Sequence, residues 1–462
     1  MIIRKLYWGA FAGGAVIIAG LAAGGIYYQA THFNRGATID GVKVGGLTAE
    51  RALNKLSGLT LKNDVYLGKQ RIVNGRNTKS QFAANDLDGV TALLKKHFSL
   101  FPSSKKMRLS LIPKQVDSYR STKLRQDVES KLDKMNKRLK APVDAEARLV
   151  GGQLTLRKSQ PGEKFDITKI MKAYDQEDYH SVIYLKPVRV QPILASSATV
   201  TKEKAVLKNL LSRSTDYTLQ DKQYPFAAAA LIQNASVTKT MKVAVDTSGI
   251  KKKLAQINQK TSTLNKNYTF KTHTGKVISV KGQSYGWALH VPAEAKRIAN
   301  ALIAGKKAIS AYNVYGTGFS TYGIGYKVRG NNGIGSTYAE VSISEQRIWL
   351  YRNGQMVLTT NVVTGRHDTH EDTPPGVWYI EYKQSPSVLE GSEAGDPNYK
   401  VKVKYWAPFT LSGCGFHDAP WRHNWSGSAY LTQGSGGCVN TPPNVMASVY
   451  NQLEQNEPVI VY

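Results

Sequence analysis

The longest uninterrupted apolar stretch of the chain lies near its N-terminus, where residues 6–28 contain no charged side chain. At a rise of about 1.5 Å per residue, a helix of this length crosses a hydrocarbon core of roughly 30 Å. Arg4 and Lys5 precede the stretch, and basic residues favour the cytoplasmic side. We therefore expect residues 1–30 to form a cytoplasmic tip and a single transmembrane anchor. A cleaved signal peptide is the alternative, although its apolar region normally spans only about 7–15 residues.

Beyond this stretch, the pattern changes from strand-like alternation to helical spacing. Apolar and polar residues alternate over 37–44, and Ala52, Leu53 and Leu56 then repeat at the spacing of one helix face. Thr48 is a suitable residue for the start of that helix. The segment predicts a short strand followed by a helix, with a structural role.

Two later stretches resemble each other in the order of their patterns. Residues 152–174 and 275–304 each predict a turn, a strand, a glycine turn and a helix. In the second helix, Pro292 lies in the first turn, Glu294 lies near the positive end and Gly305 follows the last turn. Self-similarity at this distance indicates a duplicated α+β domain.

These patterns divide the chain after its anchor into three further parts. We place the first α+β domain at residues 31–195 and the second at residues 196–320. Residues 312–335 are rich in Gly, Tyr, Ser and Asn, which is typical of a linker or crossing loop. The last domain then spans residues 335–462.

The last domain is predicted to consist mainly of β-strands. Residues 338–343 alternate, and Asn353-Gly354 between two apolar runs is a strong hairpin signal. Further strands are expected at 376–382 and 401–409. One helix is expected at 444–453, because Pro442 and Pro443 mark its start.

Length and charge add two constraints to this pattern. A chain of 462 residues suggests two to four domains. Its net charge of +29 is spread along the sequence, which implies a polyanionic environment. Because the anchor would leave the basic domains outside the cytoplasm, lipid headgroups or anionic wall polymers are expected as partners and nucleic acid is not.

The candidate chemistry lies near the C-terminus, where Cys438 follows Gly436 and Gly437 and has His417 upstream. A thiol and an imidazole supply a nucleophile and a base for acyl transfer. The two glycines leave the backbone free to adopt positive φ, so that N–H groups can face an oxyanion.

The only other cysteine is Cys414, so the chain is not a disulfide scaffold. We interpret Cys414 as a buried structural thiol. A Cys414–Cys438 disulfide would block the nucleophile and could act as a redox switch, but spacing alone does not establish that the two are close.

The stretch from about 335 to 462 closely resembles a YkuD-type L,D-transpeptidase domain. The signature of that family is a histidine, a spacer and then Ser/Thr-His-Gly-Cys-hydrophobic-Asn/Arg. The matching residues are His417, Ser435, Gly437, Cys438, Val439 and Asn440, and Thr373 to Gly376 match a Thr-Pro-x-Gly element. The chain departs from the signature at Gly436, where the family has a histidine. The two α+β domains resemble the peptidoglycan-binding domains often found ahead of such catalytic domains; the alternative is that they are rigid spacers.

The resemblance implies a role for each matching residue. Cys438 would attack the carbonyl before the terminal D-alanine of a tetrapeptide stem, with His417 as general base and Ser435 orienting the imidazole. The N–H groups of Gly437 and Cys438 would form the oxyanion hole. Because Gly436 has no side chain, His417 is the main candidate base, and His423 is a weaker one.

Other residues near the motif are candidates for contacts with substrate. Aromatic and basic side chains are expected to wall the peptide groove, and core packing is the alternative for each aromatic; the candidates are Tyr405, Trp406, Trp421 and Arg422. Tyr430 and Asn440 are weaker candidates for the site. Residues 367–372 contain two histidines and carboxylates, but we interpret them as a polar loop, because the resembled family has no metal there. No metal and no cofactor is expected.

The sequence thus predicts a multidomain protein with a transmembrane helix, two α+β domains and a mainly β catalytic domain. We expect a single-pass protein of the cell membrane whose domains face the cell wall and which cross-links peptidoglycan stem peptides. Two alternatives stay open: an L,D-carboxypeptidase on the same fold, and a non-catalytic wall-binding scaffold.

Overall fold

The computed structural model describes residues 20–115, 117–177 and 182–462. The chain divides into two compact units, one of residues 1–146 with 157–197 and one of residues 147–156 with 198–462. Residues 20–31 are helical, but most of the predicted membrane span at 6–28 lies outside the described residues. Within the described ranges, no helix is both long enough and apolar enough to cross a membrane.

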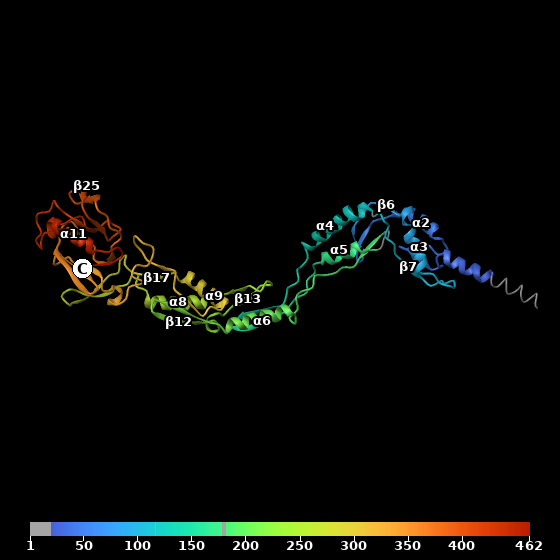
Figure 1. Ribbon diagram of the computed structural model, residues 1–462, viewed down its shortest axis with the longest axis horizontal. Helices are drawn as coiled ribbons and strands as arrows, with labels where there is room; N and C mark the ends of the chain where they lie inside the picture. The colour runs from blue at the N-terminus through green and yellow to red at the C-terminus, as the bar shows by residue number, and fades with distance from the viewer. Residues whose placement is uncertain (1–19, 116, 178–181) are drawn as a thin grey trace, which may run out of the picture. The chain divides into compact units, whose positions relative to one another are not determined.

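The first unit contains two hydrophobic cores, and the helices that form them are labelled in Figure 1. Helices α2 and α3 pack with the sheet β2-β1-β7, while α4 and α5 pack with the sheet β10-β4-β5. The strand and helix predicted at 37–56 are confirmed, and the Thr48 side chain caps α2 by accepting the Arg51 N–H. The bounds are β1 Ala37–Ile39, β2 Val42–Lys43, α2 Ala49–Ser57, β3 Thr60–Leu61, β4 Val65–Leu67, β5 Gln70–Val73, β6 Thr78–Lys79, α3 Leu87–Lys96, β7 Met107–Leu109, α4 Arg125–Asn136, α5 Ile167–Asp175 and β10 Ile183–Leu185.

The second unit opens with a hairpin from the first predicted repeat. Strand β9 of this hairpin and helix α5 are the strand and helix expected for 152–174, yet they belong to different units. The elements expected for 275–304 are confirmed as β16 and α9, and Gly305 ends α9 with φ of 73°. The bounds are β8 Glu146–Val150, β9 Gln153–Arg157, α6 Ala198–Leu211, β11 Ser214–Leu219, β12 Lys222–Ala227, α7 Ala228–Leu231, β13 Ala235–Val237, β14 Val243–Val245, α8 Ser248–Thr261, β15 Tyr268–Lys271, β16 Val277–Val280, β17 Ala288–Leu289, α9 Val291–Ala304, β18 Ala308–Ser310 and β19 Val314–Tyr315.

The C-terminal domain is built on a five-stranded sheet in the order β22-β21-β20-β29-β23. The predicted hairpin is confirmed, since Asn353 and Gly354 have φ of 50° and 82° between β21 and β22. A second sheet, β26-β27-β28, and a hairpin, β24-β25, complete it. The bounds are β20 Tyr338–Ser342, β21 Arg347–Arg352, β22 Gln355–Asn361, β23 Gly376–Tyr379, β24 Ser387–Glu393, β25 Asp396–Val403, β26 Trp406–Pro408, β27 Gly415–Asp418, α10 Tyr430–Gln433, β28 Val439–Thr441, α11 Pro443–Gln452 and β29 Pro458–Val461.

The hairpin β15–β16 packs directly on this C-terminal sheet. Tyr268 and Phe270 share a buried cluster with Tyr338 and Ile460. In the turn of the hairpin, the His273 backbone N–H donates to the buried Glu340 carboxylate at 2.9 Å. Residues 198–462 therefore form one folded unit, in which the second α+β domain and the C-terminal domain share a core.

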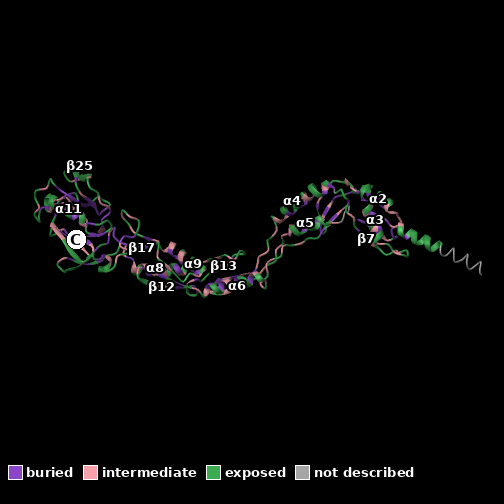
Figure 2. Cartoon of the chain, in the orientation of Figure 1, coloured by how far each residue is buried: buried purple, intermediate pink, exposed green. Residues whose placement is uncertain are grey.

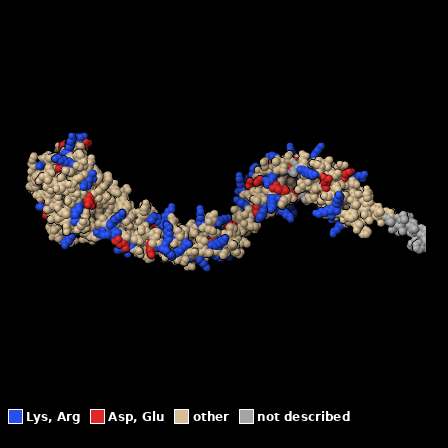
Figure 3. Space-filling view, viewed as in Figure 1, with Lys and Arg blue, Asp and Glu red and all other residues tan. Residues whose placement is uncertain are grey.

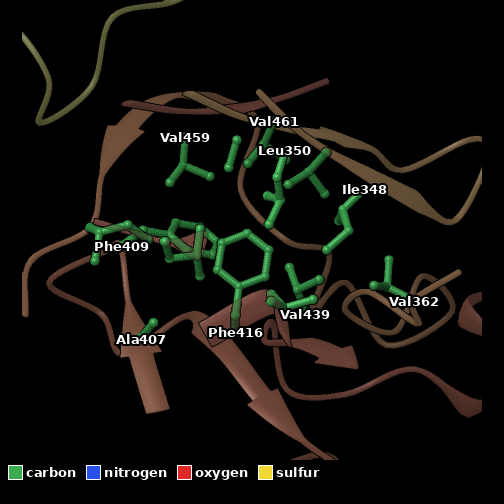
Figure 4. Close-up of a cluster of buried hydrophobic side chains, with 14 of the residues drawn as sticks. Ile348, Leu350, Val362, Ala407, Phe409, Phe416, Val439, Val459 and Val461 are labelled. Atoms are coloured by element: carbon green, nitrogen blue, oxygen red, sulfur yellow. The ribbon is translucent and has the colours of Figure 1, made fainter. Parts of the chain in front are cut away.

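A buried apolar cluster fills the space between the large sheet and the strands β26–β28 (Figures 2 and 4). Phe416 and Val439 lie in this cluster with no exposed surface. Each is a chain neighbour of a candidate site residue, because Phe416 precedes His417 and Val439 follows Cys438. Packing of these two side chains therefore fixes the strands that carry the site.

Candidate active site

The site is built on the edge-to-edge pairing of β27 and β28. These strands are parallel, with His417 opposite Asn440 and Phe416 opposite Val439. Successive side chains of a strand point to opposite faces, so Phe416 and Val439 enter the core while His417 and Asn440 share the other face. Cys438 comes directly before β28, two positions before Asn440.

Hydrogen bonds fix the orientation and tautomer of the buried His417 ring. Nδ1 lies 2.9 Å from the carbonyl oxygen of Asp418, and since a carbonyl only accepts, Nδ1 carries the proton. Oriented to satisfy its neighbours, the Asn440 amide donates to Nε2 at 3.0 Å and accepts from the Arg422 guanidinium at 2.9 and 3.1 Å. Burial, assisted by the Arg422 charge, holds the pKa of His417 below its ordinary value. Nε2 is therefore the atom that can accept a proton.

Cys438 is a free, half-buried thiol whose sulfur lies 3.5 Å from the Gly413 carbonyl oxygen. Burial raises the pKa of this thiol to about 12, and the Gly415 N–H acts in the opposite direction. Burial thus favours the neutral form of both the Cys438 thiol and the His417 imidazole. An arrangement of this kind needs a base that takes the thiol proton as the sulfur attacks.

The turn before Cys438 is held by two hydroxyl groups. The Ser435 hydroxyl donates to the Cys438 carbonyl at 2.6 Å and accepts the Gly437 N–H at 3.2 Å. Thr373 donates to the Gly437 carbonyl at 2.8 Å. The structure thus places the Ser435 hydroxyl on the backbone of the turn, whereas the sequence predicted that it orients His417. The Gly437 N–H, predicted to face the oxyanion, is bound to Ser435.

Gly436 and Gly437 are each required in the turn for a different structural reason. Gly437 has φ of 119°, in the region that disfavours any side chain, so its predicted positive φ is confirmed. A Cβ at Gly437 would also lie 2.8 Å from the Cys414 sulfur. At Gly436 the constraint is space, because a Cβ there would lie 2.9 Å from the Cβ of Glu393.

The candidate groove residues fall into two groups. The rings of Trp406 and Trp421 flank His417, with centroids 6.0 and 5.8 Å away, and Trp421 is 45 % exposed. Tyr405 instead faces Tyr450 of α11, and Tyr430 lies 6.3 Å from the His367 ring. The structure therefore brings the two tryptophans, with Arg422 and Asn440, to the imidazole, and the two tyrosines to other contacts.

Two residues of the hairpin β24–β25 were missed by the sequence reasoning. The Glu393 carboxylate accepts the Gly436 N–H at 3.0 Å. Tyr399 has a pKa raised by burial and, further, by Cys438 and Glu393. The alternating pattern of this hairpin is weak, and its closure over a turn some forty residues later leaves no local signal.

The loop at 367–372 pairs its charged groups with each other. His367 lies 3.0 Å from Asp372, and the Arg366 guanidinium binds Asp368 at 2.5 Å. Glu371 accepts a hydrogen bond from the Ala394 N–H at 2.7 Å, which links this loop to the hairpin β24–β25. These contacts fit the polar loop expected from the sequence.

Comparison with known proteins identifies two regions of the chain. Residues 336–461 match the YkuD family, described as "L,D-transpeptidase catalytic domain", and residues 193–310 match the family described as "Putative peptidoglycan binding domain". L,D-transpeptidase 1 of Mycobacterium tuberculosis is 28% identical over 125 residues, which are 26% of this chain and 48% of that protein. The chain therefore spans about half the length of the curated relatives it matches.

Solved structures similar to the chain include two of an Enterococcus faecium enzyme. A crystal structure of an E. faecium L,D-transpeptidase mutant is 26% identical, covers 56% of this chain and 98% of its own, and has a TM-score of 0.45. The solution structure of the catalytic domain from E. faecium L,D-transpeptidase is 37% identical over 27% of this chain and 96% of its own, with a TM-score of 0.26. The family matches, and the cysteine, histidine and turn described above, lead to one conclusion: residues 336–461 are an L,D-transpeptidase catalytic domain of the YkuD family, preceded in the chain by a peptidoglycan-binding domain.

Proposed function

We propose that the protein is a cysteine-dependent L,D-transpeptidase that cross-links peptidoglycan. One observation carries the proposal: in a domain of the matching family, the Cys438 thiol directly precedes the strand that pairs with His417. The imidazole is neutral and already protonated at Nδ1, so Nε2 is available as a base. The donor would be the tetrapeptide stem, and the bond cleaved would be the one before its terminal D-alanine.

In the first half of the reaction, the Cys438 thiol gives its proton to His417 Nε2 as the sulfur attacks the carbonyl carbon. The C–N bond then breaks, and His417 returns the proton to the leaving amine of D-alanine. In the resting site the Asn440 amide donates to Nε2, so the approaching thiol has to replace it. A thioester on Cys438 remains.

In the second half, an acceptor amine attacks the thioester and the C–S bond breaks. His417 takes a proton from the attacking nitrogen and returns one to the Cys438 sulfur, so a new amide forms and the thiol is restored. The Cys438 N–H is the first candidate donor to the oxyanion, and the Gly437 N–H can join once Ser435 releases it. One such donor contributes roughly 3–4 kcal/mol.

The proposal includes a membrane anchor that places the folded domains on the outer side of the cytoplasmic membrane. The uncharged stretch at 6–28, with Arg4 and Lys5 before it, has the length and flanks of a membrane anchor. On the face shown in Figure 3, Lys and Arg side chains are spread over both units. Such a surface suits attraction to anionic wall polymers or lipid headgroups. Membrane fractionation of cells, with protease treatment from the outer side, tests the location; a chain recovered only in the soluble fraction contradicts it.

The full-length chain incubated with a disaccharide tetrapeptide tests the reaction. We expect free D-alanine and cross-linked dimers, measured by liquid chromatography and mass spectrometry. Tripeptide without dimer would identify a carboxypeptidase instead. A carbapenem is expected to add one adduct to the intact mass of the chain, and the adduct should disappear in Cys438→Ala but remain in Cys414→Ala, the matched control at the other cysteine. A chain with neither products nor adduct would be a non-catalytic scaffold.

A further inference from the structure

The hairpin β24–β25 places a carboxylate beside the nucleophile turn. Glu393 ends β24, and its Oε2 accepts the Gly436 N–H at 3.0 Å. The room for this contact exists because residue 436 has no side chain: a Cβ there would lie 2.9 Å from the Glu393 Cβ and 3.3 Å from Oε2. The family signature has a histidine at the position of Gly436, and in this chain the Glu393 carboxylate lies beside that position.

Glu393 differs from the other glutamate of its strand. Glu390 pairs with Lys400 at 2.5 Å. For Glu393, by contrast, no ion pair is found within the described residues. The group is only half-exposed. A partly desolvated carboxylate without a counter-ion is costly, and a cation bound beside it offsets that cost.

The negative charge of Glu393 acts on the Cys438 thiol. The Glu393 carboxylate binds the Gly436 N–H, two residues before Cys438, and its charge acts to raise the pKa of the Cys438 thiol, of the Arg422 guanidinium and of the Tyr399 hydroxyl. A ligand group that binds Glu393 therefore lies close to the atom that carries the acyl group.

We propose that Glu393 and the Gly436 turn form the subsite for the ammonium group of the acceptor amine. The inference rests on the proposed transpeptidase function and names the chemistry of its second substrate. The acceptor carries a primary amine, which is a cation at neutral pH and is attracted by the Glu393 carboxylate.

The proton balance of the second half-reaction gives Glu393 a further part. A primary ammonium must lose two protons to become a neutral amide nitrogen. The first passes to the Glu393 carboxylate, from which it exchanges with water, and the freed lone pair attacks the thioester carbon. The second passes from the tetrahedral intermediate through His417 Nε2 to the departing Cys438 sulfur, as the C–S bond breaks. The products are the amide, a neutral thiol and one proton released to solvent.

The test separates the two half-reactions in the full-length chain. Glu393→Gln keeps an oxygen for the Gly436 N–H but removes the charge, and Glu390→Gln is the matched control on the same strand. The acyl-enzyme is formed from a tetrapeptide donor and offered two acceptors: glycinamide, which is mostly a cation at neutral pH, and hydroxylamine, which is mostly uncharged. Mass spectrometry measures the amounts of acyl group transferred to each acceptor and to water.

For Glu393→Gln we expect transfer to glycinamide to fall roughly 10- to 100-fold, the range for a lost hydrogen bond to a charged group. Acylation by the donor and transfer to hydroxylamine should stay within about twofold of the wild-type chain, and Glu390→Gln should match the wild type in all three.

Each other outcome overturns the inference. Unchanged transfer to glycinamide shows that Glu393 does not bind the acceptor. Equal loss with both acceptors, or slower acylation, shows that Glu393 only caps the Gly436 N–H. A loss of acylation confined to donors that carry a free amine would assign the carboxylate to the donor stem. If the wild-type chain forms no acyl-enzyme at all, the proposed function fails, and this inference fails with it.

Discussion

Replacement of Gly437 by alanine tests whether the geometry of the turn controls the nucleophile. Gly437 has φ of 119°, and a non-glycine residue held in such a region costs about 1–3 kcal/mol. The added Cβ would also lie 2.8 Å from the buried Cys414 sulfur, and overpacking of a core typically costs about 1–3 kcal/mol. Together these terms give about 2–6 kcal/mol, directly before Cys438.

The turn cannot release this strain without moving the nucleophile. Its backbone is held on both sides of the strained residue, by Ser435 at the Gly437 N–H and by Thr373 at the Gly437 carbonyl. A shift that clears the Cys414 sulfur must therefore break one of these bonds or displace Cys438. If only about 2 kcal/mol of the strain opposes the reactive geometry, acylation slows about 30-fold.

The assay is the rate at which a carbapenem acylates Cys438, followed by intact mass, with thermal unfolding measured on the same samples. We expect Gly437→Ala to acylate about 30-fold more slowly or worse. Adding Cys414→Ala removes the sulfur and should recover the steric part, about 1–3 kcal/mol, but not the part due to φ. Cys414→Ala alone is the control.

Two results would refute this reasoning. Wild-type acylation in Gly437→Ala would show that the turn has room to relax. Strictly additive effects of the two changes would show that the Cys414 sulfur does not limit the position of residue 437, since groups in contact are expected to couple.

Three further predictions concern the groups around the turn. Ser435→Ala leaves the Cys438 carbonyl and the Gly437 N–H without their partner, so the rate of acylation should fall roughly 10- to 100-fold with no change in its pH profile. Ser435→Thr should retain most activity. A shifted pH profile in Ser435→Ala would instead favour the role of orienting His417. Because burial lowers the pKa of His417, the imidazole stays neutral down to that lowered value, and the rate of acylation should fall only below the ordinary histidine range near pH 6.5. The free energy of unfolding should likewise fall as the pH drops through and below 6.5. A loss of acylation that begins above pH 6.5 would contradict both expectations. Arg422→Gln removes a charge that lowers the pKa of His417 and loosens Asn440, so the acid limb should move to higher pH, and an unmoved limb would show that Arg422 acts on structure alone.

The parts of the fold that the sequence predicted are those with local causes. Asn353-Gly354 forms its hairpin because both residues adopt positive φ, and α9 ends at Gly305 in the left-handed region. His417 and Cys438 were found because the chemistry of acyl transfer restricts the residue types and the family motif restricts their spacing. In each case the information lies within a few residues of the feature.

The parts that the sequence did not predict depend on contacts between distant segments. Ser435 has one proton to donate, and the partner it finds is the Cys438 carbonyl three residues on, which the motif cannot distinguish from the imidazole. Glu393 reaches Gly436 only because a hairpin folds over the turn. The insertion of His273 against Glu340 joins two domains that the composition of the linker at 312–335 suggested were separate. None of these contacts leaves a periodic or compositional trace.

The two glycines before the nucleophile are therefore required for different physical reasons, although the sequence presents them as one flexible pair. Gly437 is needed for its backbone, since no other residue readily takes its φ and clears the Cys414 sulfur. Gly436 is needed for the space beside it, since a Cβ there would lie 2.9 Å from the Cβ of Glu393. A histidine at 436, as in the family signature, would therefore require Glu393 to move. This chain has the carboxylate, which leaves His417 as the candidate base and puts an anion at the Gly436 N–H, where we propose that the incoming amine binds.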